Sequence, residues 1–183
     1  MGLLVKGVWS TQWYDTESSG GEFVRKDAQY RNQIGDVNFP AEAGRYHLFV
    51  SLACPWAHRT LILRTIKKLE SIIGVSVVEA EMLDHGWVLS DKESIKYGFE
   101  ASPIPNIKYM YEVYTTHQSD YSGRVTVPVL WDKKNNCIVN TESSEIIRML
   151  NTEFNDFTDD QTDYYPDPLR VAIDEINEPV FLN

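Results

Sequence analysis

Cysteine and positive charge are scarce in this chain, and long apolar runs are missing. Only Cys54 and Cys137 are cysteines among 183 residues, too few for a disulfide framework. The chain has 17 basic and 27 acidic residues, and the formal charge of −10 argues against nucleic acid or an anionic membrane surface as a partner. No apolar stretch approaches the roughly 20 residues of a membrane span, and the first residues lack a signal-peptide pattern. We therefore expect a cytoplasmic protein.

Hydrophobic residues make up 43% of the chain and aromatic residues 12%, which is enough for a globular α/β domain with a hydrophobic core. One short segment carries the most information. Residues 46–50 are an apolar run typical of a buried strand, and apolar residues at helical spacing follow over 61–69. Pro55 suits the first turn of that helix, which places Cys54 at the helix N-terminus.

A helix N-terminus favours a cysteine thiolate over the thiol, because unpaired N–H groups and the helix dipole stabilise negative charge there. Cys54 is therefore the candidate nucleophile, and its alternative role is that of a small buried hydrophobe. Position 57 is Ala, where a dithiol oxidoreductase would carry a second cysteine. A mixed disulfide at Cys54 would thus be resolved by an external thiol, such as glutathione or a relative. Cys137 lies in a predicted strand, where burial is the expected role.

The rest of the chain divides by composition and periodicity. We predict an extended, irregular N-terminal arm followed by one domain. The domain begins with a strand, a helix and a second strand, continues with a long insertion that holds one short helix near 107–114, and ends with a strand hairpin and a helix that opens at 141–144. A linker and a final helix follow. The corresponding ranges are 1–44 for the arm, 45–152 for the domain, 84–124 for the insertion within it, 153–168 for the linker and 169–183 for the start of a helical domain.

Four segments together resemble the glutathionyl-hydroquinone reductases, the Xi class of the glutathione transferases. They are Cys54-Pro55-Trp56-Ala57-His58-Arg59, Asp84-His85-Gly86-Trp87, Arg124-Val125-Thr126-Val127-Pro128-Val129-Leu130 and Asn140-Thr141-Glu142-Ser143. The resemblance covers nearly the whole chain. It implies a thioredoxin-like βαβ–ββα fold, the N-terminal domain of such a transferase, followed by an all-helical C-terminal domain.

The resemblance also implies roles in binding glutathione, a co-substrate. Glu142 would take the α-ammonium of its γ-glutamyl group and Ser143 the α-carboxylate, whereas their alternative role is helix capping. A cis Val127–Pro128 bond would present the backbone of Val127 to the cysteinyl part. Trp87 and Arg124 resemble further glutathione contacts, and their alternatives are a core indole and a solvated charge.

Two other residues of the cysteine motif are less defined. Trp56 is interpreted as a packing residue, and His58 could neighbour the thiolate or have no role. Cys54 and His58 have the i, i+4 spacing of a metal pair, but no matching cluster exists elsewhere in the sequence. We expect no metal.

The activity that the resemblance implies is glutathione-dependent reduction of glutathionyl-hydroquinones, with a Cys54–glutathione mixed disulfide as the intermediate. Tyrosines of the family's C-terminal domain supply the proton, and we expect a homodimer of the full-length protein. These 183 residues are expected to be the N-terminal part of a longer protein, or a fragment of one. Alone they would hold the thiol site but lack the hydroquinone pocket and the proton donor, so glutathione binding should outlast turnover. The alternatives are an omega-type thiol transferase or dehydroascorbate reductase and a non-catalytic interaction module.

Overall fold

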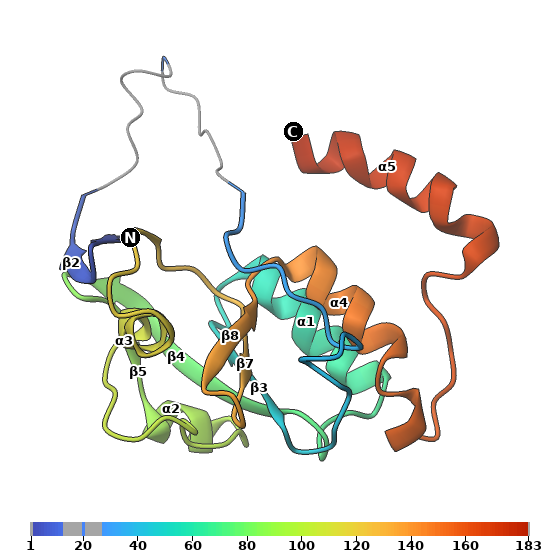
Figure 1. The fold of residues 1–183 in the computed structure, drawn as a ribbon, viewed down its shortest axis with the longest axis horizontal. Helices are drawn as coiled ribbons and strands as arrows, with labels where there is room; N and C mark the ends of the chain where they lie inside the picture. The colour runs from blue at the N-terminus through green and yellow to red at the C-terminus, as the bar shows by residue number, and fades with distance from the viewer. Residues whose placement is uncertain (1, 13–19, 21–26, 183) are drawn as a thin grey trace.

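The core of the molecule is a mixed five-stranded sheet with helices on both faces, in strand order β5-β4-β3-β7-β8 (Figure 1). This computed structural model describes residues 2–12, 20 and 27–182. The strands are β1 (Leu3–Val5), β2 (Val8–Ser10), β3 (Tyr46–Val50), β4 (Gly74–Leu83), β5 (Gly86–Leu89), β6 (Gly123–Arg124), β7 (Val129–Asp132) and β8 (Cys137–Asn140). The helices are α1 (Pro55–Ile66), α2 (Asp91–Lys96), α3 (Met110–His117), α4 (Ser143–Thr152) and α5 (Arg170–Leu182), with short 3-10 turns at Asn155–Phe157 and Asp167–Leu169.

The β3-α1-β4 unit predicted from the sequence is confirmed. Strands β3 and β4 run parallel, with Leu48 opposite Val75, and α1 connects them. The predicted hairpin is also present, because β7 pairs antiparallel with both β3 and β8. The sheet is therefore thioredoxin-like.

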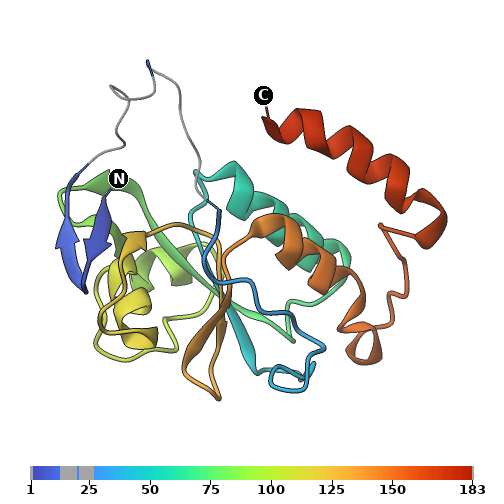
Figure 2. The same cartoon turned by 45° about the horizontal axis from the view of Figure 1, so that its top comes forward.

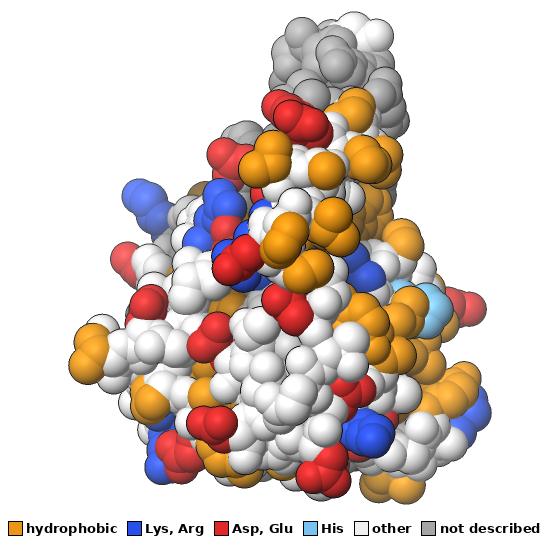
Figure 3. Space-filling model, turned by 90° about the vertical axis from the view of Figure 1, so that its right-hand side faces the viewer, with side chains coloured by type: hydrophobic (Ala, Val, Ile, Leu, Met, Phe, Trp, Pro, Cys, Tyr) orange, Lys and Arg blue, Asp and Glu red, His pale blue; other side chains and the backbone are white. Residues whose placement is uncertain are grey.

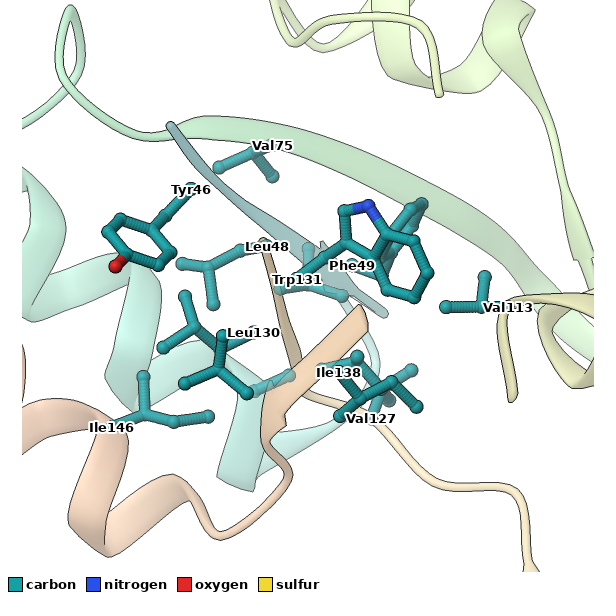
Figure 4. Close-up of a cluster of buried hydrophobic side chains, with 14 of the residues drawn as sticks. Tyr46, Leu48, Phe49, Val75, Val113, Val127, Leu130, Trp131, Ile138 and Ile146 are labelled. Atoms are coloured by element: carbon teal, nitrogen blue, oxygen red, sulfur yellow. The ribbon is translucent and has the colours of Figure 1, made fainter. Parts of the chain in front are cut away.

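Alternation along the strands divides the core between the two faces of the sheet. Leu48 and Leu130 are paired across β3 and β7 and lie with Ile146 of α4 on one face, as Figure 4 shows. Phe49 and Trp131 lie on the other face, toward α3 (Figure 4). All five side chains are buried. The two helix layers, α1 with α4 and α2 with α3, therefore cover opposite faces.

Residues 84–124 hold more regular structure than the one short helix predicted there. Strand β5 extends the sheet beside β4, and α2, α3 and β6 follow it. Helix α3 lies close to the predicted position, whereas α2 was not predicted. The hydroxyl of Ser90 accepts a hydrogen bond from the Glu93 amide and caps α2, which makes a six-residue helix possible without an apolar periodicity.

The N-terminal arm is not irregular throughout. Strands β1 and β2 form a hairpin that pairs with β6, so the prediction is wrong for residues 3–10. Lys6 and Gly7 form its two-residue turn with φ of 50° and 78°, a conformation that fits a tight hairpin. The Trp9 indole donates a hydrogen bond to the Asp84 carbonyl at 2.8 Å and stacks on Tyr111. The arm prediction for residues 13–19 and 21–26 lies outside the described residues.

The segment after α4 is anchored to the end of α1 by a buried lysine. The ammonium group of Lys67 donates to Oδ1 of Asn155 at 3.0 Å and to the carbonyls of Asp160 and Thr162 at 2.9 and 2.7 Å. Helix α5 then lies beyond α4, away from the sheet (Figure 2). None of the helices in the described part of the chain has the length and apolar character needed to cross a membrane.

Hydrophobic side chains remain exposed on α5 and on α1. Val171, Ile176 and Val180 of α5 are 71%, 68% and 73% exposed, and Figure 3 shows hydrophobic side chains gathered on this side of the molecule. On α1, Trp56 and Ile62 are also exposed. Trp56, expected to pack, is 47% exposed because the helix turns Ala57 and Thr60, not Trp56, toward the sheet.

Candidate functional site

Cys54 precedes the first turn of α1 as its N-cap residue. Pro55 occupies the first helical position, and the Cys54 carbonyl accepts the first helical hydrogen bond from the His58 amide at 2.9 Å. The Cys54 amide donates to the Ser51 carbonyl at 3.1 Å, which fixes the chain between β3 and α1. The side chain is partly exposed. Cys54 therefore lies at the helix N-terminus, as predicted.

The Cys54 sulfur faces the backbone of the segment before β7. The Val127–Pro128 bond is cis, as the resemblance implied, and the Cys54 sulfur lies 3.7 Å from the Val127 carbonyl oxygen. Tyr114 of α3 holds this segment: its hydroxyl donates to the Thr126 carbonyl at 3.0 Å and accepts from the Thr126 amide at 3.1 Å. A buried tyrosine of the insertion thus positions the backbone next to the nucleophile.

Glu142 and Ser143 lie at the start of α4, which is the position predicted for them. The Glu142 amide donates to Oδ1 of Asn140 at 2.7 Å, and the Glu142 carboxylate accepts from the amide and hydroxyl of Ser144 at 3.2 and 2.9 Å. Glu142 therefore caps the helix, which was its alternative role, and its carboxylate stays close to the helix start. The side chains of both Glu142 and Ser143 are largely buried.

Arg59 joins the cysteine helix to this second helix start. Its guanidinium donates from Nε and Nη2 to the Ser143 hydroxyl oxygen at 3.0 and 2.6 Å, and Nη2 lies 3.6 Å from Oε1 of Glu142. Arg59 is part of the cysteine motif in the sequence, but no role was predicted for it. The available signal was its position, five residues after Cys54 on the same helix.

Trp87 and Arg124 are held by different segments. Trp87 is partly buried on β5 opposite Met82, and Arg124 on β6 pairs with Leu3. The Arg124 guanidinium donates to the Gln12 carbonyl at 2.7 Å. The structure therefore places Cys54 against Val127 and links its helix to Glu142 and Ser143 through Arg59. Trp87 on β5 and Arg124 on β6 lie at other places, and Arg124 is beside the N-terminal hairpin.

The second cysteine has a different environment. Cys137 begins β8 opposite Asp132, and burial, together with the negative charge of Asp132, raises the pKa of its thiol. A raised pKa leaves less thiolate near neutral pH, so Cys137 is the poorer nucleophile of the pair in this respect. His58 is exposed on α1. Within the described ranges no group of three or more His, Cys, Asp or Glu side chains could hold a metal ion.

The arrangement suits a small anionic or zwitterionic thiol compound. Cys54 contacts the Val127 backbone, and Arg59, on the helix that Cys54 caps, contacts the start of α4, where a carboxylate and a hydroxyl are adjacent. The hydroxyl and the helix N-terminus favour a carboxylate, and the Glu142 carboxylate favours an ammonium group. Thiol exchange is the chemistry that such a site supports.

A family model described as "Glutathione S-transferase, N-terminal domain" matches residues 53–153 of the chain. The glutathionyl-hydroquinone reductase PcpF of Sphingobium chlorophenolicum is 50% identical over 181 residues, which are 99% of this chain and 56% of that protein. The range matched by the family model contains Cys54, Arg59, Trp87, Arg124, Val127, Glu142 and Ser143.

Solved structures give the same relationship. A Xi-class glutathione transferase from Natrialba magadii superposes with a TM-score of 0.84 at 40% identity, over 99% of this chain and 54% of that chain. The glutathione-bound structure of YqjG, a glutathione transferase homologue from Escherichia coli K-12, gives 0.79 at 42% identity, over 97% of this chain and 54% of that chain. The chain thus spans about half the length of the relatives that it matches.

Proposed function

Because this chain belongs to the glutathione S-transferase family, we propose that it binds glutathione with Cys54 as the nucleophile and serves the reduction of glutathionyl-hydroquinones. The observation that carries the proposal is the contact of the Cys54 sulfur with the Val127 carbonyl at 3.7 Å, beside the cis Val127–Pro128 bond. The name of the relative PcpF, a glutathionyl-hydroquinone reductase, supports the same reaction.

Glutathione would reach from Cys54 to the start of α4. Its cysteinyl part would meet the Val127 backbone, and its γ-glutamyl end would reach α4, with the ammonium near Glu142 and the carboxylate near Ser143. Trp87 and Arg124 would contribute contacts from the insertion and from β6. We propose no metal for this site, because thiol exchange needs only a thiolate and an accessible sulfur.

The chemistry proceeds in two exchanges at sulfur. The Cys54 thiolate attacks the sulfur that joins glutathione to the aromatic ring, the sulfur–carbon bond breaks, and a Cys54–glutathione disulfide forms. The electron pair of the broken bond, with a proton, goes to the ring carbon, so the ring is reduced and the hydroquinone leaves. A second glutathione thiolate then attacks the glutathione sulfur of the mixed disulfide, which releases glutathione disulfide and restores Cys54.

We assign the hydroquinone pocket and the proton donor to helices beyond those described. Trp56 and Ile62 of α1 and Val171, Ile176 and Val180 of α5 are exposed apolar side chains, which supports this assignment. Residues 169–183 would then be the start of a helical domain after a connecting segment, 153–168. We further propose a cytoplasmic protein that works as a homodimer in its full-length form, with neither nucleic acid nor membrane as a partner.

The test is a comparison of substrates at equal concentration with glutathione as the reductant. The protein in its full-length form, with the helical domain proposed above, is supplied with a glutathionyl-hydroquinone, with dehydroascorbate and with a mixed disulfide of glutathione, and the released hydroquinone, ascorbate or thiol is measured. The proposal expects hydroquinone release that depends on Cys54. Faster reduction of dehydroascorbate or of the mixed disulfide would favour the omega-type activity, and no reaction with any of the three would favour an interaction module.

A further inference from the structure

Arg59 controls what kind of hydrogen bond Ser143 can make. A serine hydroxyl has two acceptor lone pairs and a single O–H donor. Two guanidinium N–H groups, on Nε and Nη2 of Arg59, point at the Ser143 oxygen at 3.0 and 2.6 Å. Because both N–H groups of Arg59 donate to this oxygen, its acceptor side faces the guanidinium, and the O–H group is what Ser143 offers to a ligand. A donor of this kind selects an anion, such as a carboxylate.

Arg59 also changes the charge balance at this helix start. Glu142 is the residue next to Ser143, and its carboxylate would repel a ligand carboxylate bound at Ser143. The Arg59 guanidinium lies 3.6 Å from Oε1 of Glu142 while it contacts Ser143. It therefore places positive charge between the two positions. A site for an ammonium and a site for a carboxylate can then lie side by side.

We propose that Arg59 is a positioning residue that makes the α4 site select thiol compounds with an α-carboxylate on their γ-glutamyl group. Arg59 acts through Ser143, which it holds as a donor, rather than by forming the reactive thiolate. The inference rests on the proposed function, since it assumes that glutathione places its γ-glutamyl end at α4. Arg59 would thus be a residue of α1, the helix that follows Cys54, that helps to determine which ligands bind at α4.

The experiment compares ligands that lack one charged group each. Isothermal calorimetry with the 183-residue chain measures the dissociation constants of glutathione, of 4-aminobutanoyl-cysteinylglycine, which lacks the α-carboxylate, and of glutaryl-cysteinylglycine, which lacks the α-ammonium. We expect the wild-type protein to bind the ligand without the carboxylate about 10- to 100-fold more weakly than glutathione, as for a lost hydrogen bond to a charged group.

In Arg59→Gln the loss of the carboxylate should raise the dissociation constant, relative to that of glutathione, by only about twofold or less. The corresponding increase for the ligand without the ammonium should stay within about twofold of its wild-type value. Arg59→Lys keeps the charge without the paired N–H groups and should give an intermediate increase for the ligand without the carboxylate. It also keeps the proposal testable where the glutamine variant does not fold. Arg148→Gln is the matched control, because it removes an arginine of α4 that pairs with Asp174 at 3.2 Å, and both of its increases should equal those of wild type.

Two results would overturn the role of Arg59 alone. Arg59→Gln could weaken all three ligands equally, which is the effect of a structural residue, or Arg59→Lys could match wild type, in which case the paired hydrogen bonds are irrelevant. Failure of the wild-type protein to bind glutathione would instead overturn the proposed function, and this inference with it. The three outcomes are separable because each is read from a different protein or ligand.

Discussion

The sulfur of Cys54 lies 3.7 Å from the carbonyl oxygen of Val127, although 73 residues separate them in the chain. The contact joins the start of α1 to the segment before β7, and the buried hydroxyl of Tyr114 holds that segment from α3. The nucleophile is thus placed against a backbone edge by two elements that pack on opposite faces of the sheet.

Replacing Cys54 by Ala should abolish transfer of a glutathionyl group from glutathione disulfide to the protein, because no other thiol lies at a helix N-terminus in the described chain. Cys137→Ala is the control and should leave the transfer nearly unchanged, since burial raises the pKa of the Cys137 thiol. Intact-protein mass spectrometry after a fixed reaction time measures the adduct. Equal losses from the two substitutions would contradict the assignment.

Glu142→Gln should weaken glutathione binding by about 1–3 kcal/mol, because the ammonium of the ligand loses its charged partner. Glutamine keeps an oxygen that can accept from Ser144, so the cap of α4 is preserved and the effect on folding stays small. Calorimetric titration with glutathione measures the change, and Glu153→Gln, at the far end of α4, serves as the control. An unchanged dissociation constant in Glu142→Gln would remove Glu142 from the site.

Acid should destabilise the protein through His47. Its side chain is fully buried, its Nε2 contacts the Ser76 hydroxyl at 2.7 Å, and Nδ1 has no hydrogen-bond partner among the described residues. Glu100 approaches only to 3.9 Å. Burial, aided by the charges of Lys133 and Arg64, lowers the pKa of His47 from 6.5 to about 3.

His47 therefore binds a proton near pH 6.5 in the unfolded chain, but only near pH 3 in the folded protein. The contribution of His47 to the free energy of unfolding is fully present above the pKa of the unfolded state. Below that pKa the contribution falls by about 1.4 kcal/mol for each pH unit. Urea unfolding at a series of pH values should show a shallower loss for His47→Gln than for wild type. The exposed His58, replaced by Gln, is the control, and parallel curves for His47→Gln and wild type would refute the argument.

Lys67→Met should lower the free energy of unfolding by about 1–3 kcal/mol, because it removes the buried ammonium that donates to two partly buried carbonyls. The carbonyls are those of Asp160 and Thr162, so the segment after α4 should also become more open to limited proteolysis. Lys68→Met, at the exposed neighbouring position, should change neither quantity. Unaltered proteolysis of Lys67→Met would show that the lysine does not anchor the segment.

The sequence predicted the elements that carry a strong local signal. The strand at 46–50, the helix after Pro55 and the hairpin with Val127–Pro128 were found because apolar periodicity and a proline mark them. Helix α2 was missed although Ser90 and Glu93 form a capping signal, since six residues are too few for a helical period. The β1–β2 hairpin was missed for a similar reason, because each strand has only three residues.

Within the site, single positions could be predicted but links between them could not. Cys54 and the Glu142-Ser143 pair stand at helix starts, which a sequence pattern can indicate. The bridge from Arg59 to Ser143 spans 84 positions and depends on how α1 packs beside α4. The same holds for Lys67 and the segment at 155–162, because the contacts of this buried lysine with two carbonyls span more than 90 positions of the chain.

The central claim is that Cys54 takes the glutathionyl group from a glutathionyl-hydroquinone. The most direct measurement is a single-turnover reaction of the full-length protein with a glutathionyl-hydroquinone in the absence of free thiol, followed by intact mass and peptide mapping. The account predicts one glutathionyl group on Cys54 for each hydroquinone released, and neither product with Cys54→Ala. Release of hydroquinone without a Cys54 adduct, or an adduct on Cys137, would contradict it.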